Sequence, residues 1–356
     1  MENIEEYRKA INDIDGQMAE LFKKRMAISK NIADYKKELG LPVKDEKREE
    51  QIYARCAERI DDPEIESYYV NFQKNVIDLS CEYQTRLMEG IRVSYSGVEG
   101  AYAYMAAKKM FPGAQLIACS NFGPAYNAVL EGKADFAVLP LENSYAGDVG
   151  AVMDLAFDGP LYVNRVCNLN VEHSLIGVPG ATIADIKTVV SHPQALMQCS
   201  EFLQENSQIQ QISTENTAVS AQAVKNGGDP SHAAIGREAC AGLYGLEVLK
   251  DDIVDDPSNT TRFIIVSSKK IYSEDADRVS IVFEASHQTG SLYSLLSHII
   301  HNDLNMTKIE SRPVPGKAWE YRFFVDFEGN LSEASVKNAL RGIIEEAIYF
   351  KILGNY

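Results

Sequence analysis

The chain has 356 residues, a formal net charge of −16 and a pI near 4.9, and 45% of its residues are hydrophobic. This length and composition predict a globular protein of two or three domains, and the negative charge argues against nucleic acid or an anionic membrane surface as a partner. No apolar run approaches the roughly 20 residues that span a bilayer, and the N-terminus lacks the features of a secretory signal, so we expect a cytoplasmic protein. The six cysteines are scattered without a C-x-x-C pair, which favours reduced core residues over a metal or redox site.

Residues 1–90 contain little Gly or Pro and are expected to be helical. A first helix over about residues 4–39 carries apolar residues in a 3,4 spacing, which is typical of a helix that pairs with a partner. This apolar stripe comprises Ile11, Ile14, Met18, Leu21, Ile28, Ile32, Tyr35 and Leu39. A helix of that length would run on the order of 54 Å, which is too long for one small domain unless it pairs with a partner.

One slot of the stripe is occupied by Arg25, so the pattern predicts a guanidinium on a buried seam. A buried unpaired charge costs several kcal/mol, and Arg25 is therefore expected to hold an anion. Lys36 follows eleven residues later, roughly 20° beyond three full turns, and faces the same side. Arg8 lies about 100° around the helix from Arg25, so it would serve a second site if two long helices pair about a two-fold axis.

Two further helices are expected to add polar groups to this site. Asp45 is a plausible N-cap of a short second helix, with Arg48 and Glu49 in its first turns. Ser80 and Gln84 are four residues apart on one face of a third helix. Cations together with a carboxylate, a hydroxyl and an amide suit a small dianion that bears a hydroxyl group.

Over about residues 4–88 this constellation resembles the all-helical chorismate mutase domain. The matching positions are Arg8, Arg25, Lys36, Asp45, Arg48, Glu49, Ser80 and Gln84. The resemblance implies an intertwined helical dimer in which Arg8 crosses into the partner's site. It also implies rearrangement of chorismate to prephenate without a metal or cofactor, with Lys36, Gln84 and Glu49 as catalytic residues. Lys36 and Gln84 would donate hydrogen bonds to the ether oxygen as it gains negative charge.

Residues 91–270 alternate short β-branched runs with helical stretches, which predicts an α/β fold. Polar residues stand at the ends of three of these runs, where ligand sites gather in open α/β sheets. They are Glu142, Asn143 and Ser144 in "LENS", Ser191, His192 and Gln194 in "SHPQ", and Thr260, Thr261 and Arg262 in "TTRF".

Over residues 91–268 these motifs resemble prephenate dehydratase, which implies two α/β lobes similar to type II periplasmic binding proteins. The strand "TRFIIVSS" is expected to return to the first lobe. Prephenate would lose carbon dioxide and hydroxide to give phenylpyruvate, with Thr261 donating to the leaving hydroxyl and a neighbour that the sequence does not identify assisting it. Arg262 would hold a carboxylate or pair with Asp255 or Asp256. The expected prephenate-binding residues are Asn143, Ser144, Ser191, Gln194, Thr260, Thr261 and Arg262.

After a polar linker at residues 271–277, the chain predicts strand, helix, strand, strand, helix and strand over residues 278–356. This βαββαβ order is typical of a ferredoxin-like α+β domain. Two motifs, "TGSLYSLL" and "KIESRP", resemble those of the phenylalanine-binding ACT domain. The implied phenylalanine-binding residues are Gly290, Ser291, Leu292, Glu310, Ser311 and Arg312.

Taken together, the three regions resemble the bifunctional P-protein family of phenylalanine biosynthesis. This resemblance implies a mutase domain at 1–90, a dehydratase domain at 91–270 and an ACT regulatory domain at 278–356. The family implies chorismate and prephenate as substrates, feedback inhibition by L-phenylalanine, no cofactor, and a homodimer or higher homo-oligomer. The chain lacks the glycine fingerprint that a fused dehydrogenase would need. The intact Thr261 argues against a non-catalytic ligand sensor. Whether arogenate is also a substrate stays open.

Overall fold

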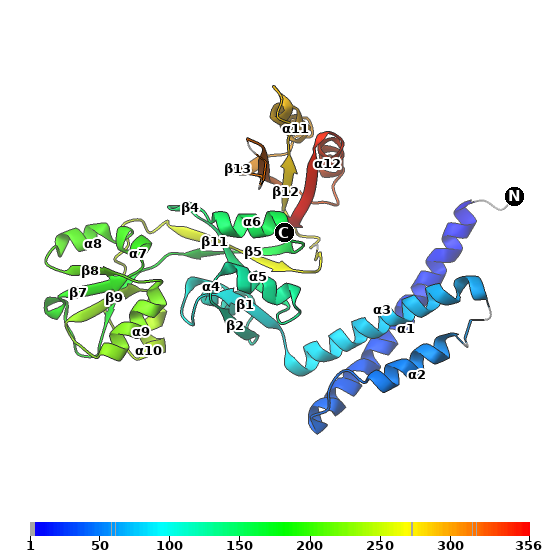
Figure 1. The fold of residues 1–356 in the computed structure, drawn as a ribbon, viewed down its shortest axis with the longest axis horizontal. Coiled ribbons are helices and arrows are strands. Elements are labelled where there is room, and N and C mark those ends of the chain that lie inside the picture. Colours follow the sequence, from blue (N-terminus) through cyan, green and yellow to red (C-terminus); the bar gives the residue numbers. More distant parts are fainter. Residues whose placement is uncertain (1–3, 58, 61, 272, 315, 318) are drawn as a thin grey trace. The chain divides into compact units, whose positions relative to one another are not determined.

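The structure is a computed structural model that describes residues 4–356 with gaps at 58, 61, 272, 315 and 318; the side chains of residues 46, 56 and 57 are also outside the described set. The chain forms two compact units, residues 1–91 and residues 92–356. They span the blue-to-cyan and the cyan-to-red parts of Figure 1. None of the helices in the described part of the chain combines the length and apolarity that crossing a lipid bilayer requires.

The described residues of the first unit form three helices, as the sequence predicts. They are α1 (Ile4–Leu39), α2 (Glu46–Ala57) and α3 (Pro63–Glu89). The predicted N-cap at Asp45 is confirmed, because its Oδ1 accepts a hydrogen bond from the backbone N–H of Arg48 at 3.1 Å. Asp62 caps α3 in the same way, and Pro63 occupies the first helical position, where its missing N–H costs nothing.

The apolar stripe of α1 is not buried within the chain. Its eight residues are 41–64% exposed, because α3 packs against a neighbouring face of α1 where Ser29 and Ala33 are buried. These small side chains allow the two helices to approach closely. The prediction of a buried Arg25 on this stripe is therefore wrong for the single chain. Arg25 is half-buried, and its Nη1 donates to the backbone oxygen of Val76 on α3 at 3.2 Å.

The strands of the first lobe form one end of a ten-stranded sheet in the second unit (Figure 1). Its strands are β1 (Arg92–Ser96), β2 (Gln115–Cys119), β3 (Phe136–Asn143), β4 (Gly147–Asp148), β5 (Tyr162–Asn170) and β11 (Thr260–Ser267), and its helices are α4 (Tyr102–Met110), α5 (Phe122–Leu130) and α6 (Gly150–Asp158). The predicted return of "TRFIIVSS" is confirmed, because β11 runs antiparallel between β5 and β3. This return places two distant motifs, at residues 140–143 and 260–263, on adjacent strands.

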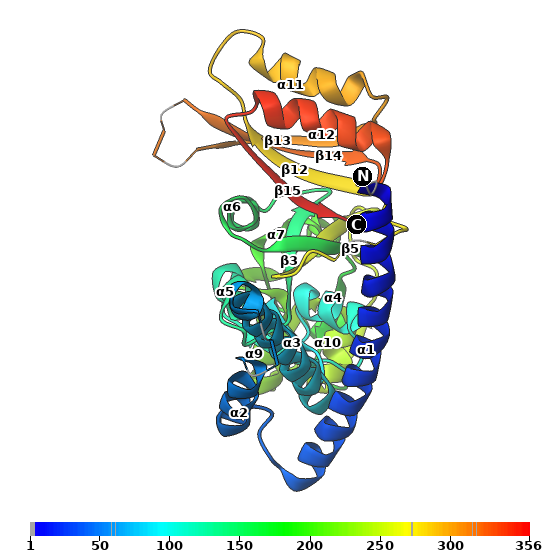
Figure 2. The same ribbon diagram turned by 90° about the vertical axis from the view of Figure 1, so that its right-hand side faces the viewer.

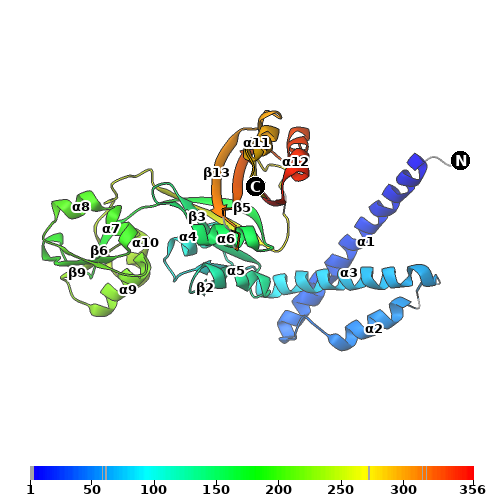
Figure 3. The same cartoon turned by 45° about the horizontal axis from the view of Figure 1, so that its top comes forward.

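The second lobe has its own five-stranded sheet in the order β10-β6-β9-β7-β8. Its elements are β6 (Ser174–Gly177), a 3₁₀ turn (Ile183–Asp185), β7 (Thr188–Ser191), α7 (Pro193–Met197), α8 (Ser200–Glu205), β8 (Gln210–Ser213), α9 (Thr217–Gly227), β9 (His232–Gly236), α10 (Glu238–Tyr244) and β10 (Glu247–Lys250). Only two segments, residues 171–173 and 251–259, connect the two lobes within the described chain (Figure 3). The predicted two-lobed α/β arrangement is thus present.

The last 79 residues form the predicted βαββαβ order. Its elements are β12 (Arg278–Glu284), α11 (Ser291–Ile300), β13 (Met306–Pro313), β14 (Tyr321–Glu328), α12 (Ala334–Glu346) and β15 (Tyr349–Asn355). The four antiparallel strands carry α11 and α12 on the face away from the first lobe (Figure 2). β15 also pairs with β5 at Gly354 and Val163, so this C-terminal sheet continues the sheet of the first lobe.

One apolar core spans both parts of this continuous sheet. Val282, Phe324 and Leu353 from the C-terminal strands pack in the same cluster as Met153 of α6 and Leu139 of β3. The sequence predicts a polar linker between two domains and does not predict this shared core. The C-terminal layer therefore lies directly against the lobe that carries the motifs at residues 140–143 and 260–263.

The described cysteines are unpaired. Cys167, Cys199 and Cys240 are buried, whereas Cys81 and Cys119 are half-buried. The side chain of Cys56 lies outside the described set.

Candidate functional sites

Three charged side chains of the helical unit gather around Cys81 of α3. Lys36 donates from Nζ to the backbone oxygen of Val43 at 2.5 Å, and the Cys81 thiol lies 3.9 Å from Glu49 Oε1. Burial raises the pKa of the Cys81 thiol, and the Glu49 carboxylate raises it further while Lys36 opposes the shift. Burial also lowers the pKa of Arg25, whose guanidinium interacts with the same thiol. Two cations of α1 and one carboxylate of α2 therefore gather around the Cys81 thiol of α3.

Ser80 and Gln84 lie one turn apart on the buried face of α3 beside this cluster. The Ser80 hydroxyl donates to the backbone oxygen of Val76 at 2.8 Å. The Oε1 atom of Gln84 is buried and has no hydrogen-bond partner among the described residues. Leaving a buried acceptor unpaired costs roughly 1–3 kcal/mol, so this position favours a polar ligand. Rotation of the amide by 180° would present its NH₂ group instead.

Three of the predicted chorismate-binding residues lie outside this cluster. Arg8 is 67% exposed and pairs with Glu5 at 3.0 Å. It lies 17 residues before Arg25, or roughly 26 Å along the helix, so it cannot join Arg25 within one chain. Arg48 is exposed, and its Nη1 lies 3.4 Å from Gln51 Oε1. Asp45 is exposed and serves as the N-cap of α2.

A cleft of about 470 Å³ lies between the two lobes of the second unit. Of the predicted prephenate-binding residues, Asn143, Gln194 and Thr261 line it, and so does His192. Asn143 and Thr261 face each other because they are directly paired on β3 and β11. A cleft of this size with a few convergent polar groups is the usual form of a small-molecule site.

Asn143 holds Thr261 in a defined hydrogen-bonding state. The Nδ2 of Asn143 donates to Thr261 Oγ1 at 3.0 Å and to Asn259 Oδ1 at 2.7 Å. Its Oδ1 accepts from the backbone N–H groups of Tyr145 and Ala146 at 3.0 and 2.8 Å, which fixes the amide orientation. Because Thr261 accepts from Asn143, its own hydroxyl proton can be donated to a ligand in the cleft.

Three other predicted residues are not brought to the wall of the cleft. Ser144 is exposed, and its Oγ accepts from the Thr260 backbone N–H at 2.9 Å. The Thr260 hydroxyl donates to Asn170 Oδ1 at 3.2 Å. Ser191 is fully buried and donates to the backbone oxygen of Ile235 at 2.7 Å. These hydroxyls connect backbone segments of each lobe.

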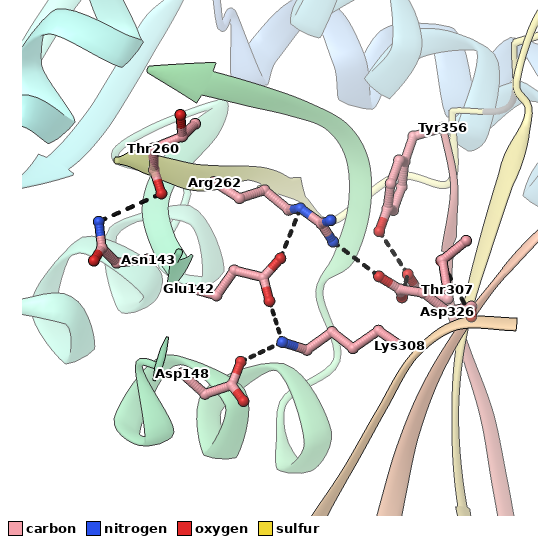
Figure 4. A network of polar contacts seen from close by, with 10 residues as sticks. Glu142, Asn143, Asp148, Thr260, Arg262, Thr307, Lys308, Asp326 and Tyr356 are labelled. Carbon is pink, nitrogen blue, oxygen red and sulfur yellow. Dashed lines mark hydrogen bonds and ion pairs between the residues drawn. The ribbon is translucent and has the colours of Figure 1, made fainter. Parts of the chain in front are cut away.

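Arg262 is not among the residues that line the cleft, and its guanidinium points toward Asp326 of the C-terminal sheet (Figure 4). Its Nε pairs with Glu142 at 2.9 Å and its Nη1 with Asp326 at 3.0 Å. Asp326 is fully buried, which makes Arg262 a structural partner. The expected alternative partners are wrong: Asp255 accepts from the backbone of α8, and Asp256 accepts from Ser258. The reason is the alternation of a strand, which turns Arg262 to the face opposite Thr261.

The C-terminal sheet also contributes a cation behind the cleft. Lys308 of β13 contacts both Glu142, which precedes Asn143, and Asp148, which lines the cleft (Figure 4). Lys308 is only 13% exposed. Burial opposes its charge, but the hydrogen bonds and charges of Asp148 and Glu142 outweigh burial, and the pKa of Lys308 is raised.

The cleft contains polar residues that the sequence prediction missed. They are Ser96, Tyr102, His173, Gln198, Glu215, Asn216 and Thr217. Gln198 lies four residues after Gln194, so helical spacing could have identified it. Glu215 and Asn216 follow β8, and the rule of strand ends applies to them as well. No local signal marks His173. The described lining contains no Lys or Arg, and it includes residues at the start of α4 (101–103) and of α9 (216 and 217), where helix N-termini favour anions.

The residues predicted to bind phenylalanine separate into two places. Gly290, Ser291 and Leu292 line a surface hollow of about 510 Å³ at the start of α11. Gly290 has φ +87°, a conformation that favours glycine. Glu310, Ser311 and Arg312 lie on β13, outside that hollow. Arg312 forms a two-pronged ion pair with Asp154 of α6, at 3.0 and 2.7 Å.

Comparisons with known proteins match both units. The family "Prephenate dehydratase" matches residues 93–271, and "Chorismate mutase type II" matches residues 7–85. The chain is 30% identical to a bifunctional chorismate mutase/prephenate dehydratase of Escherichia coli K12, covering 98% of this chain and 95% of that protein. It is 37% identical to the chloroplastic arogenate dehydratase/prephenate dehydratase 1 of Arabidopsis thaliana, covering 75% and 72%. A solved prephenate dehydratase from Arthrobacter aurescens in complex with L-Phe is similar, with TM-score 0.70, 30% identity and coverage of 75% and 89%.

Proposed function

The chain belongs to the family of bifunctional chorismate mutase/prephenate dehydratases, which rearrange chorismate to prephenate and convert prephenate to phenylpyruvate in phenylalanine biosynthesis, and we propose which residues carry each reaction. The mutase domain occupies residues 1–90, the dehydratase domain 91–270 and a regulatory domain 278–356. The assignments rest on the side chains that the fold brings together and, for Arg8, Asp45 and Arg48, which lie outside the cluster in one chain, on the resemblance to the mutase family.

In the mutase domain, Arg25 and Arg48 clamp the two carboxylates of chorismate and hold its reactive conformer. Lys36 and Gln84 donate to the ether oxygen as the bond to it breaks. Asp45, Glu49 and Ser80 complete the site as partners for the substrate's polar groups. The buried, unpaired Oε1 of Gln84, three residues after the Cys81 thiol that Lys36 and Glu49 influence, supports this assignment.

Two copies of the mutase domain pair through the apolar stripe of α1. An apolar stripe that is 41–64% exposed along a helix of 36 residues favours a second copy of the same helix as its cover. Arg8, which is roughly 26 Å from Arg25 along its own helix, then reaches the site of the other chain. The active mutase is in this proposal an intertwined homodimer.

In the dehydratase domain, Thr261 donates its proton to the leaving hydroxyl of prephenate. The bond to the ring carboxylate breaks, its electron pair enters the ring, and the C–O bond breaks, which yields carbon dioxide, water and phenylpyruvate. Asn143 is the assisting neighbour: its amide N–H stabilises the negative charge that develops on Thr261 Oγ1. The proton of Thr261 is then restored from solvent.

The remaining predicted residues of the cleft act in two ways. Gln194 and the N-termini of α4 and α9 hold substrate carboxylates, since the described lining has no cation. Ser144, Thr260, Ser191 and Arg262 hold the segments that carry Asn143, Thr261 and Gln194 in place. The single observation that carries the dehydratase assignment is the 3.0 Å hydrogen bond from Asn143 to Thr261.

Substitution at these two positions tests the assignment in the full chain. Thr261→Ala should lower kcat on supplied prephenate by at least about 10³-fold, whereas Thr261→Ser should retain roughly a tenth of it or more. Asn143→Ala should cost on the order of 10²-fold. Mutase activity in the same preparation is the control. Near wild-type dehydratase activity in Thr261→Ala, with phenylpyruvate followed by its absorbance, would refute the assignment.

The regulatory domain is an ACT domain that binds L-phenylalanine between two chains. The relative from Arthrobacter aurescens in complex with L-Phe supports this ligand. Gly290–Leu292 and Glu310–Arg312 lie in separate places within one chain, which favours a site completed by a second copy. Gly290→Val should remove phenylalanine inhibition while prephenate turnover persists, because a β-branched residue is strained at φ +87°. Unchanged inhibition would place the effector elsewhere.

A further inference from the structure

His173 is a buried residue of the cleft to which the proposed mechanism assigns no part. It lies in the segment that crosses from β5 to β6, between the two lobes, and is 2% exposed. Its Nε2 is 3.0 Å from Gln198 Oε1, and its ring packs edge-to-face on Tyr102 with a centroid distance of 6.1 Å. Its backbone oxygen accepts from Ile253 in the other crossing segment at 2.9 Å. The imidazole is therefore held in one orientation from several sides.

His173 lines the cleft, and its second ring nitrogen, Nδ1, is buried without a partner among the described residues. A carboxamide oxygen can only accept, so Nε2 carries the ring proton and Nδ1 presents a lone pair. Nδ1 is buried, and no described residue pairs with it. Burial and the nearby Arg237 lower the pKa of His173 against the opposing hydrogen bond to Gln198, so the ring is neutral near pH 7. The cleft thus holds a fixed, neutral acceptor.

An unpaired buried acceptor costs free energy, so it favours a ligand that supplies a hydrogen-bond donor. Near neutral pH, prephenate carries two ionised carboxylates and a ketone, all of which can only accept. Its one donor is the hydroxyl that must leave the ring. That hydroxyl can donate its hydrogen to one group while a lone pair accepts from another, which is the pair of roles that His173 and Thr261 offer from one cleft.

We propose that His173 Nδ1 accepts a hydrogen bond from the leaving hydroxyl of the substrate and thereby turns the oxygen lone pair toward Thr261. The inference rests on the dehydratase function proposed above. His173 takes no proton in this scheme. The hydroxyl keeps its own hydrogen, receives the second one from Thr261, and departs as water. Gln198 acts through His173, because its Oε1 selects the tautomer that leaves Nδ1 unprotonated.

A matched pair of variants in the full chain separates this role from a structural one. In His173→Gln the side-chain amide reaches the place of Nε2, so the Gln198 contact can persist while the Nδ1 acceptor is lost. In His173→Asn the amide lies near the place of Nδ1, so an acceptor remains while the Gln198 contact is lost. We expect kcat on prephenate to fall roughly 10- to 100-fold in His173→Gln, and by less than about fivefold in His173→Asn.

Kinetics and the mutase activity of the same preparations decide between the outcomes. Wild-type kcat in His173→Gln, or equal losses in both variants, would overturn the acceptor role. A wild-type chain that does not dehydrate prephenate would instead refute the proposed function itself. The change should lie in kcat more than in KM, because the contact aligns the leaving group more than it adds affinity.

A spectroscopic measurement covers the case in which neither variant folds. The Thr261→Ala chain, labelled with ¹⁵N-histidine, binds prephenate without rapid turnover. The chain has six histidines, and the His173 signal is the one that survives in each of the five other single His→Asn variants. Its Nδ1 resonance should move as prephenate is added, toward that of a hydrogen-bonded acceptor. An Nδ1 resonance that stays unchanged at saturating prephenate would contradict the proposal.

Discussion

The two proposed sites of this protein share one molecule, prephenate, as product of the first and substrate of the second, and they differ in electrostatic surroundings. The helical unit, which forms it, places Arg25 and Lys36 around a half-buried cluster. The cleft, which consumes it, has no Lys or Arg in its described lining and offers Asn143, Gln194 and Thr261. Among the described residues, the acidic chain therefore places cations at one proposed site and none in the lining of the other.

The difference follows from what happens to charge in each reaction. The rearrangement keeps both carboxylates and develops negative charge on an ether oxygen, so fixed cations stabilise the transition state. The dehydration converts a carboxylate into neutral carbon dioxide. A cation paired with that carboxylate would stabilise the ground state more than the transition state and would slow the reaction. In the proposed cleft site, amides, hydroxyls and backbone N–H groups would bind the dianion without this cost.

The largest expected effect comes from a substitution that inactivates the mutase site and leaves the dehydratase site intact. Lys36→Met should lower mutase kcat by about 10³-fold, because the ether oxygen loses a charged donor, and should leave turnover of supplied prephenate unchanged. Loss of chorismate absorbance and gain of phenylpyruvate absorbance measure the two reactions. Lys37→Met, which removes an exposed cation one residue away, is the matched control and should keep both activities. Parallel loss of both activities in Lys36→Met would refute separate sites.

A second change tests whether the neutral donor of the mutase site must stay neutral. In Gln84→Glu, mutase kcat near pH 7.5 should fall roughly 100-fold, because an ionised carboxylate cannot donate to the ether oxygen. Activity of the variant should rise as the pH falls through the pKa of the introduced carboxyl, which burial at this 7% exposed position raises. A pH profile parallel to that of the wild type would exclude Gln84 as the donor.

A smaller effect is expected where a cation lies behind the cleft, whose described lining has no Lys or Arg of its own. Lys308→Met leaves Glu142 and Asp148 facing each other without their shared partner. Dehydratase kcat/KM should fall roughly tenfold and the melting temperature of this unit should drop, while Lys308→Arg should retain most of both. Mutase kcat is the internal reference. Full activity at an unchanged melting temperature would mean that the Lys308 contacts do not position Asn143.

The smallest expected effect concerns ionic strength and compares the two wild-type sites directly. Raising the salt concentration from about 0.05 to 0.5 M screens partly exposed charges, so KM for chorismate should rise roughly three- to tenfold. KM for prephenate at the dehydratase should change less than about twofold, since its contacts are dipolar. Equal salt dependence at both sites would remove the electrostatic contrast.

Local pattern predicted the elements and the residue types of both sites. The 3,4 spacing predicted α1, Asp45 was identified as a cap, and the runs "FAVLPLEN" and "MTKIESRP" match β3 and β13. These features depend on neighbours within a few residues, through propensity, capping and periodicity. The placement of polar motifs at strand ends likewise predicted that Asn143, Gln194 and Thr261 share a cleft.

The partners of those residues depended on long-range packing, which no local pattern contains. Asn143 meets Thr261 across 118 residues of sequence, and Arg262 selects Glu142 and Asp326 over the nearby Asp255 because β11 presents alternate faces to different layers. Ser191 has the same strand-end position as Asn143, yet its hydroxyl lies inside the second lobe. The sequence by itself thus determined the elements and the kinds of chemistry. The tertiary structure alone decided which polar groups line the cleft, which connect backbone segments, and that His173 has an unpaired acceptor. The reason is that burial and hydrogen-bond satisfaction exist only once distant segments are packed together.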